Sequence, residues 1–353
     1  MTTSQQPVSV FKAAPRHIAP CTTDPCLTDQ AVANQPRQPL TPRVQLTSAN
    51  QADFGRKPLV AHHNLHHSEL FTDEALIKLL DNFPRQNLYA ITMGNDPCRN
   101  ENQRALTDGV NGAQLLQAVR NGRLWLNITR VDQADQRYRT LIDELYGQLT
   151  SQLPGFTPDF SQGTLLISSP NAMVYYHADG PSSVLWHIRG RKRVWVYPAL
   201  DERYMRREHL EDICAGVRHE YLPYEHHYDQ AALAYDLEPG QWAAWPQNAP
   251  HRVTNLNSLN VSLSTEHFTP QSRRRVQVYA ANHFLRTRLG LRQLSQRENG
   301  VGAAMKTAIQ HLARKMGLDS THNKRYTPTL RVDANAPSGV AALVDMIKSK
   351  THL

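Results

Sequence analysis

Residues 177–198 read HADGPSSVLWHIRGRKRVWVYP, and this stretch decides the fold. It opens with His177 and Asp179 ahead of a Gly-Pro turn. Two runs rich in Val, Ile, Tyr and Trp follow, at 183–188 and 193–197, and Gly190 marks a second turn between them. Short runs of this kind, separated by turn residues, are typical of antiparallel strands. We therefore expect two strands joined by a tight turn.

Similar short runs lie on both sides of this stretch. They are separated by Pro, Gly, Asn or Asp, and they cover residues 164–168, 172–177, 241–245, 251–255 and 259–265. Repeated short strands favour an antiparallel barrel over an α/β fold. We therefore predict a mainly β core with helices, in which a double-stranded β-helix (the jelly-roll or cupin barrel) occupies residues 161–270.

The regions outside the barrel have different patterns. Residues 1–55 are polar and rich in proline, so we expect an extended or partly disordered arm. Residues 56–160 contain two helical stripes, one beginning after Thr72 and one along 138–149, which should pack on the barrel. Helical spacing returns in residues 271–353, at 305–316 and again at 340–347. These C-terminal helices must bury apolar faces, either on the barrel or in a homodimer.

Composition narrows the class of protein. The chain has 353 residues, 40% of them hydrophobic, as in an ordinary globular protein, and a formal net charge of +8. No apolar run reaches the ~20 residues of a membrane span, and no secretory signal is evident, so we expect a cytoplasmic protein without a membrane partner.

The four cysteines of the chain form no CxxC pair, and we expect them to be reduced. The many arginines after residue 272 could contact nucleic acid, but solvated helix faces account for them better because no aromatic residues are interleaved.

His177, Asp179 and His251 form the candidate metal site. Two imidazoles and one carboxylate leave three positions open on a non-haem Fe(II) ion. His177 ends one expected strand, and Asp179 reaches back from the turn that follows. His251 opens a late strand after a proline-containing turn, and antiparallel closure should bring that strand beside the first.

Two rival histidine groups are present. His227 and Asp229 repeat the His-x-Asp spacing, but they lie in a loop-like stretch and leave too little chain before His251 to build a barrel. The four histidines between 62 and 67 have helical metal-binding spacing but no carboxylate or cysteine to complete a site. We assign these four to the surface or to packing.

An oxygenase of this kind also needs a cation for the far carboxylate of a keto acid. Arg252 is unsuitable, because as the neighbour of His251 it should point to the opposite face of the strand. The segment 177–198, with 237–255, resembles the JmjC family, especially the cupin-like protein hydroxylases related to the asparaginyl hydroxylase that inhibits hypoxia-inducible factor. In that family a Gly-x-Lys turn follows the His-x-Asp pair at the spacing of Gly190 and Lys192. The resemblance implies that Lys192 binds 2-oxoglutarate.

The resemblance has departures. Gln241 replaces the usual Asp after Pro-Gly, and Val174 replaces a hydroxyl residue before the iron-binding histidine. Ser183 and either Tyr176 or Tyr175 are candidates for that missing co-substrate contact. Strand alternation turns Ser183, Leu185 and His187 into the barrel, so His187 is either a co-substrate contact or a core histidine.

We therefore expect an Fe(II)- and 2-oxoglutarate-dependent dioxygenase that uses O2 to hydroxylate a peptide or protein side chain, or a free amino-acid-like molecule. No catalytic residue is predicted beyond the metal centre. A metal-dependent cupin isomerase or lyase that uses no keto acid stays open as an alternative, as does a non-catalytic interaction module. Lys192 distinguishes the oxygenase from the isomerase or lyase, because an enzyme that uses no keto acid needs no buried cation at this position.

Overall fold

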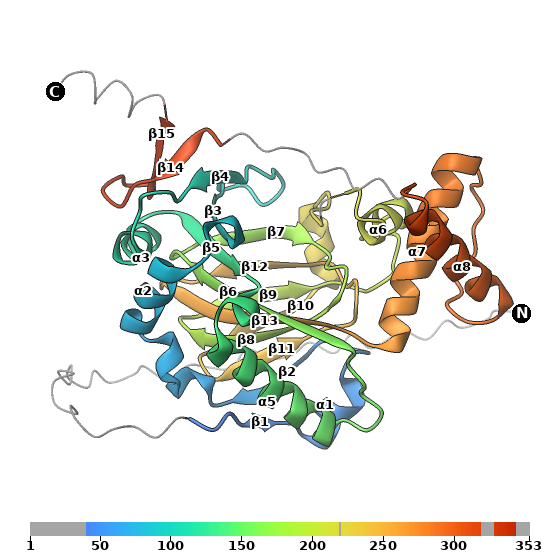
Figure 1. Ribbon diagram of the computed structural model, residues 1–353, viewed down its shortest axis with the longest axis horizontal. Helices are drawn as coiled ribbons and strands as arrows, with labels where there is room; N and C mark the ends of the chain where they lie inside the picture. The colour runs from blue at the N-terminus through green and yellow to red at the C-terminus, as the bar shows by residue number, and fades with distance from the viewer. Residues whose placement is uncertain (1–39, 219, 319–327, 344–353) are drawn as a thin grey trace, which may run out of the picture. The chain divides into compact units, whose positions relative to one another are not determined.

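Two sheets, whose barrel strands are all antiparallel, face each other to form the barrel (Figure 1). The computed structural model describes residues 40–218, 220–318 and 328–343, all of which lie in the larger of two units, Pro39–Leu353. In the larger sheet the barrel strands run in the order β11 (Gln241–Ala244), β8 (Ser182–Arg189), β13 (Asn260–Phe268), β6 (Phe160–Ser168). In the smaller sheet they run β10 (Leu233–Leu237), β9 (Lys192–Val196), β12 (His251–Asn255), β7 (Met173–His177). Consecutive strands mostly alternate between the sheets, which is the double-stranded β-helix predicted from the sequence.

Strand β8 shows why this sequence closes into a barrel. Leu185 packs inside the barrel against apolar residues of the smaller sheet, whereas Val184, Trp186 and Ile188 belong to the outer core. The alternation predicted from the sequence is therefore confirmed. Both faces of β8 are covered, so its side chains are almost continuously buried.

Strand β10 was not predicted. It pairs with β9 at the edge of the smaller sheet, and Leu237 is its one buried residue. A strand with only one buried side chain shows no alternation of apolar and polar residues, so its sequence does not predict it.

Further strands lengthen the larger sheet beyond the barrel. On one side lie β2 (Leu59–His63) and β1 (Val44–Gln45); on the other lie β5 (Leu124–Thr129), β3 (Leu88–Thr92), β4 (Gln103–Leu106), β14 (Leu330–Val332) and β15 (Val340–Ala342). Short 3-10 helices connect them: η1 (Leu65–His67), η2 (Glu69–Phe71), η3 (Arg85–Asn87) and η4 (His226–Ala231). The described part of the chain thus contains one sheet of eleven strands and one of four.

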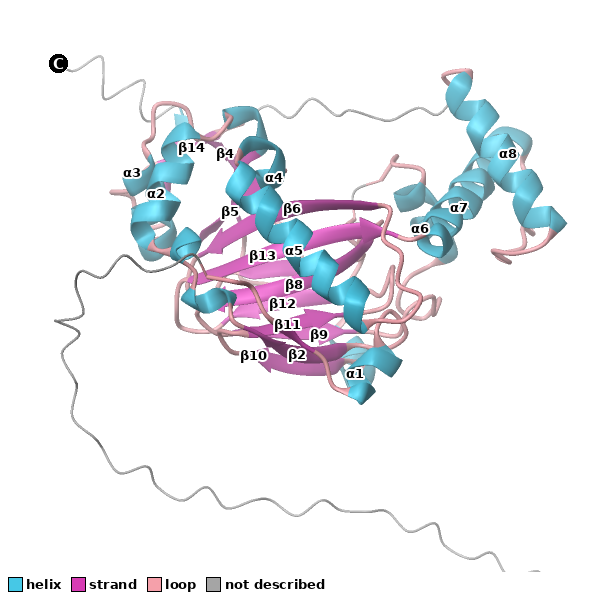
Figure 2. Ribbon diagram, turned by 60° about the horizontal axis from the view of Figure 1, so that its bottom comes forward, coloured by secondary structure: helices cyan, strands magenta, loops and turns pink. Residues whose placement is uncertain are grey.

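The helices before the barrel cover the outer face of the larger sheet (Figure 2). They are α2 (Asp73–Asn82), α3 (Gly112–Asn121), α4 (Val131–Ala134) and α5 (Gln136–Gln152). The Thr72 side chain caps α2, as predicted. Tyr138, Leu145 and Leu149 of α5 are buried in the same core as Trp186, so the helical stripe predicted along 138–149 is confirmed.

Part of the predicted arm is folded. Residues 40–55 include β1 and helix α1 (Ser48–Asp53), where the expectation of an extended or disordered segment was wrong. Thr47 and Asn50 form a capping box, which satisfies backbone donors at the start of α1. Gln148 of α5 accepts a hydrogen bond from the Val44 amide, 2.8 Å away. The rest of the predicted arm lies outside the described residues.

The C-terminal region is only partly helical. Helices α6 (Arg207–Cys214), α7 (Pro270–Leu289) and α8 (Val301–Lys315) pack on one another. Val340, which was predicted to begin a helix, instead begins β15 and pairs with Val332. A three-residue strand has too few positions to distinguish strand from helix spacing. The remainder of that predicted helix, from residue 344, lies outside the described residues.

The outer face of α8 is apolar and exposed, at Val301, Met305, Leu312 and Met316. A homodimer formed through these C-terminal helices stays a prediction.

Some of the basic residues after position 272 form ion pairs. Arg273 pairs with Asp159, Arg275 with Glu298, and Arg286 with both Glu211 and Asp212. Arginines placed this way stabilise the packing of α7 against its neighbours. None of the helices in the described ranges is long and apolar enough to cross a membrane.

Candidate metal centre

His177, Asp179 and His251 meet at one end of the barrel. The ligand atoms that they offer lie within 4.8 Å of one another. Nε2 of His177 is 3.7 Å from Asp179 Oδ1, and Nε2 of His251 is 3.7 Å from Asp179 Oδ2. Two imidazole nitrogens and one carboxylate therefore surround a single point, as the spacing in the sequence predicted.

An irregularity in β7 turns His177 toward that point. Val174 pairs with Val253 and His177 pairs with His251, so three steps along β7 match two steps along β12. One extra residue of this kind is a β-bulge, which re-aims the side chains that follow it. As a result Val174 and His177 both line the barrel cavity, although strict alternation would place them on opposite faces.

Backbone carbonyls fix the orientation of both imidazoles. Nδ1 of His177 lies 2.7 Å from the carbonyl oxygen of Tyr175, and Nδ1 of His251 lies 3.0 Å from that of Ala249. A carbonyl can only accept, so each Nδ1 carries a proton and each Nε2 presents a lone pair. Burial and the neighbouring His177 lower the pKa of His251 to about 4, so its ring is neutral at physiological pH.

Polar side chains also hold the turn that carries Asp179. The Ser183 hydroxyl donates to Asp179 Oδ2 at 2.7 Å. Asn248, in the left-handed region with φ 62°, donates from Nδ2 to the carbonyl of Asp179 at 2.8 Å. Gln247 donates to the carbonyl of Gly180 at 2.9 Å. The loop before His251 thus clamps the turn after His177, which joins two distant parts of the sequence.

Lys192 lies in the interior on β9, on the same face as Val194 and Val196. Only 4% of it is exposed, and burial lowers the pKa of its ammonium group from 10.5 to about 7. Among the described residues no carboxylate lies within ion-pair distance of it. Because an unpaired buried charge is costly, a site of this kind favours an anion that enters the barrel.

His187 and Tyr176 differ from each other in their placement. His187 faces the barrel interior, as predicted, but Nδ1 lies 3.0 Å from Ser262 Oγ and Nε2 lies 2.9 Å from the Gly190 carbonyl. Both ring nitrogens are therefore satisfied, which supports the core-histidine interpretation. Tyr176 packs in the outer cluster with Tyr197, and its hydroxyl donates to the Tyr204 carbonyl. The placement of Tyr176 in the co-substrate pocket was wrong, because the bulge in β7 turns it away from the cavity.

Asp229, part of the rival His-x-Asp pair, has a structural role. The Arg252 guanidinium donates to Asp229 Oδ2 at 2.6 Å and stacks over the Trp195 ring at 3.5 Å. Arg252 thus points away from the metal site, as predicted. His63 is a buried packing residue whose Nε2 lies 3.0 Å from the Gln241 carbonyl.

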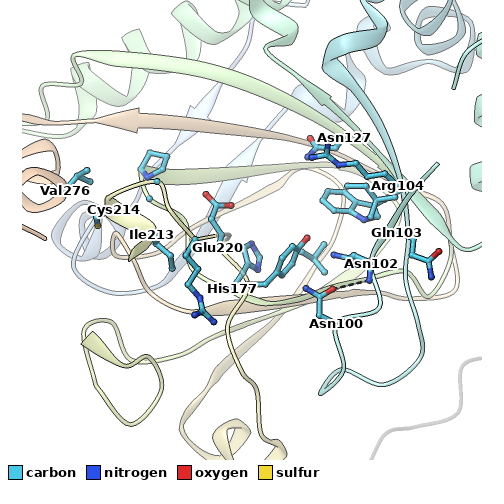
Figure 3. Close-up of a pocket in the computed structure, with 18 of the residues that line it drawn as sticks. Asn100, Asn102, Gln103, Arg104, Asn127, His177, Ile213, Cys214, Glu220 and Val276 are labelled. Atoms are coloured by element: carbon cyan, nitrogen blue, oxygen red, sulfur yellow. Dashed lines mark hydrogen bonds between the residues drawn. The ribbon is translucent and has the colours of Figure 1, made fainter. Parts of the chain in front are cut away.

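The metal site opens into a cavity of about 480 Å³ that continues into a wider mouth of about 980 Å³. Five residues line both: Trp125, Asn127, Val174, His177 and Glu220. Figure 3 shows the Glu220 carboxylate beside the His177 ring on one wall of the mouth, with Asn127 and Arg104 across from them. The cavity is therefore polar on several sides.

Two glutamates line the cavity. Desolvation, followed by the nearby charge of Asp179, raises the pKa of Glu220 to about 8 and that of Glu266 to about 7, so a large share of both carboxyl groups is protonated at neutral pH. Gln162 donates a 2.9 Å hydrogen bond to Glu266 Oε2. The sequence analysis missed both glutamates, because they lie outside the recognisable motif.

The sequence analysis also missed Trp125 and Asn127 of β5. Among the described residues, the indole Nε1 of Trp125 and Oδ1 of Asn127 are buried without a hydrogen-bond partner. Both residues line the cavity, and buried polar atoms left unpaired are candidates for ligand contacts. The signal available in the sequence was a single asparagine within the apolar run LWLNIT.

No protein-family model matches the chain, and no curated protein matches it. Solved structures do. An X-ray structure of E. coli ycfD is 15% identical with a TM-score of 0.47, over 78% of this chain and 69% of that one. The E. coli ribosomal oxygenase YcfD with cobalt and 2-oxoglutarate is 15% identical with a TM-score of 0.44, over 82% and 74%. The DMSP lyase DddQ from Ruegeria pomeroyi is 11% identical with a TM-score of 0.21, over 32% and 41%. These similarities are too low to assign a function, so a proposal for this chain rests on its own side chains.

Proposed function

We propose that the chain is an Fe(II)- and 2-oxoglutarate-dependent dioxygenase that hydroxylates its substrate. One observation carries the proposal. A convergent set of two imidazoles and one carboxylate lies in the same barrel as a buried ammonium group that has no carboxylate partner among the described residues. The metal set alone would suit many cupins, whereas the buried Lys192 calls for an anionic ligand.

The three candidate ligands fit Fe(II), and Lys192 is a buried cation on the inner face of β9, although it does not line the cavity at the metal site. His177, Asp179 and His251 would hold Fe(II) by Nε2, a carboxylate oxygen and Nε2, and Ser183 would keep Asp179 in place. Lys192 would bind the far carboxylate of 2-oxoglutarate. Bound iron and 2-oxoglutarate would supply the oxidation of a substrate C–H bond by O2, with release of succinate and CO2. The role of this chain is to orient the ligands and to exclude water from the barrel.

Turnover of 2-oxoglutarate tests the proposal. Purified protein loaded with Fe(II) should convert labelled 2-oxoglutarate to succinate slowly even without its substrate. His177→Ala should abolish this conversion, and Lys192→Met should remove it at ordinary co-substrate concentrations. A fully iron-loaded protein that neither binds nor converts 2-oxoglutarate would contradict the proposal.

The cavity walls favour a substrate that donates hydrogen bonds. Glu220, Glu266 and the unpaired Oδ1 of Asn127 present acceptors around the metal site. The wide mouth would admit a peptide or protein side chain, or a free amino-acid-like molecule, with its donor group foremost. A library of peptides and amino acids, screened by mass spectrometry for the gain of one oxygen atom, would identify it. Glu220→Ala, which removes the acceptor oxygens, should raise KM more than it changes kcat.

A metal-dependent lyase or isomerase without a keto acid is the second candidate. It is favoured by Glu266, whose pKa of about 7 suits a general base at neutral pH. The two functions differ in their need for Lys192. Lys192→Met should abolish an oxygenase but leave a lyase that uses Glu266 largely active, and Glu266→Gln should do the reverse.

A further inference from the structure

A second group of potential metal ligands lies on the surface beside the cavity mouth. Asp96 and Cys98 lie in the connection between β3 and β4, and His226 begins η4. The three residues are exposed, and the ligand atoms that they offer lie within 4.8 Å of one another. None of them belongs to the centre formed by His177, Asp179 and His251.

Local contacts hold these three side chains together. Asp96 Oδ1 accepts a 2.9 Å hydrogen bond from the Cys98 amide, which turns the chain so that both side chains share one side. The His226 ring packs edge-on against Tyr224, with centroids 5.6 Å apart. The Glu225 carboxylate is a second acidic group, beside Asp96, that acts on the Cys98 thiol.

We propose that Asp96, Cys98 and His226 bind a structural Zn²⁺ ion, with Glu225 or a water molecule as the fourth ligand. Thiolate, imidazole and carboxylate are the three ligand types that zinc accepts in proteins, at bond lengths of about 2.0 to 2.3 Å. The thiolate distinguishes this site from the barrel centre, because a sulfur ligand selects zinc over the hard cations that carboxylates alone would favour.

A nucleophilic role suits Cys98 less well. The Asp96 and Glu225 carboxylates lie near the exposed thiol, and negative neighbours do not activate a cysteine as a nucleophile. A divalent cation reverses this effect, because a coordinating thiol loses its proton outright. The same negative charge that suppresses a nucleophile therefore assists a metal site.

A metal ion here would join two segments that wall the mouth of the cavity. On one side, Asn100, Asn102 and Gln103 follow Cys98. On the other, Glu220 and Tyr221 precede His226, and Tyr221 is bridged to His177 at the end of β7. Zinc would thus cross-link the β3–β4 connection to the segment next to a ligand of the barrel centre. The site does not depend on the proposed oxygenase activity.

Cobalt substitution tests the proposal without any assay of activity. The full-length protein, stripped of metal and titrated with Co²⁺ alone, should develop a near-ultraviolet thiolate-to-cobalt charge-transfer band. The barrel centre has no sulfur ligand and cannot produce that band. Cys98→Ser should remove the band, and His226→Gln should weaken Co²⁺ and Zn²⁺ binding at this site at least about tenfold. His177→Ala should leave the band intact.

His62 provides a control, because it is an exposed histidine outside the cluster. His62→Gln should keep the charge-transfer band and the Zn²⁺ affinity. The proposal is overturned if wild-type protein shows no band when fully loaded with Co²⁺. It is equally overturned if the band survives in Cys98→Ser, which would place the sulfur ligand elsewhere.

Discussion

His177 and His251 are directly paired in register across the smaller sheet, with ring centroids 4.0 Å apart. They are 74 positions apart in the chain, and the bulge in β7 is what turns the first ring toward the second. Asp179 completes the set from the turn, and its two oxygens lie at equal distances of 3.7 Å from the two Nε2 atoms. The candidate metal centre therefore depends on strand pairing as much as on the identity of its proposed ligands.

Removing one imidazole should abolish metal binding at the barrel. We expect His251→Ala to reduce the Fe(II) or Co²⁺ affinity of this centre by at least about a hundredfold, because the ring supplies one of only three protein ligands. Metal content after dialysis and calorimetric titration measure this effect. His62→Gln, at an exposed histidine, is the control and should keep wild-type metal content. Equal metal affinity in both variants would contradict the assignment.

Replacing the buried ammonium group of Lys192 should affect both co-substrate binding and the stability of the ligand-free protein. Lys192→Met should abolish 2-oxoglutarate binding. At pH below 7 it should stabilise the ligand-free protein by up to about 4 kcal/mol, the equivalent of roughly three pKa units. The folded protein holds this pKa near 7 instead of 10.5. Between these values the unfolded chain binds more protons, so the gain should fade as pH rises toward 10. Chemical denaturation at pH 6 and pH 9.5 measures it, and a destabilised variant would contradict the account.

The affinity for 2-oxoglutarate should fall as pH rises above about 7. In the ligand-free protein Lys192 loses its proton near that pH, and pairing with a carboxylate then requires a proton to be taken up. The apparent Kd should rise about tenfold per pH unit until the pKa of the complex is reached. Lys192→Arg is the control, because a guanidinium stays protonated and should give a flat profile if it binds at all. A flat wild-type profile is the contrary outcome.

Loss of the Ser183 hydroxyl should weaken the metal site without destroying it. Ser183→Ala removes the hydrogen bond to Asp179 Oδ2, so the carboxylate is less well oriented. Mutations of residues that orient metal ligands typically cost about 10- to 100-fold in metal affinity. Metal titration measures this loss. Ser182→Ala is the neighbouring control and should bind metal as the wild type does.

The pair of Arg252 and Asp229 should matter for folding. Arg252 is 9% exposed and also stacks on Trp195, so Arg252→Ala should cost about 2 to 4 kcal/mol of unfolding free energy. Arg193 and Asp236 form an exposed pair in the same sheet, and Arg193→Ala should cost less than about 1 kcal/mol. Urea denaturation of both variants compares them. Asp229→Asn should keep the wild-type metal content, because Asp229 is paired with Arg252 and lies outside the proposed ligand set.

Elements with local sequence signals could be predicted before the fold was known. The alternation along residues 183–188 predicted which faces of β8 are buried, and the Thr72 cap predicted where α2 begins. The ligands His177, Asp179 and His251 could be named because their spacing and flanking turns are recognisable within a few residues. Turn and strand signals of this kind depend on neighbouring residues alone.

Tertiary structure decided what depends on contacts between distant residues. The bulge that turns Tyr176 out of the barrel arises from pairing with β12, and a strand's own sequence does not specify its partner's register. Glu220 and Glu266 reach the cavity, and Asp96 and Cys98 meet His226, only because the folded sheets bring segments more than forty residues apart together. Contacts of this kind produce no periodic pattern in the sequence, because each distant segment contributes only one side chain to the site.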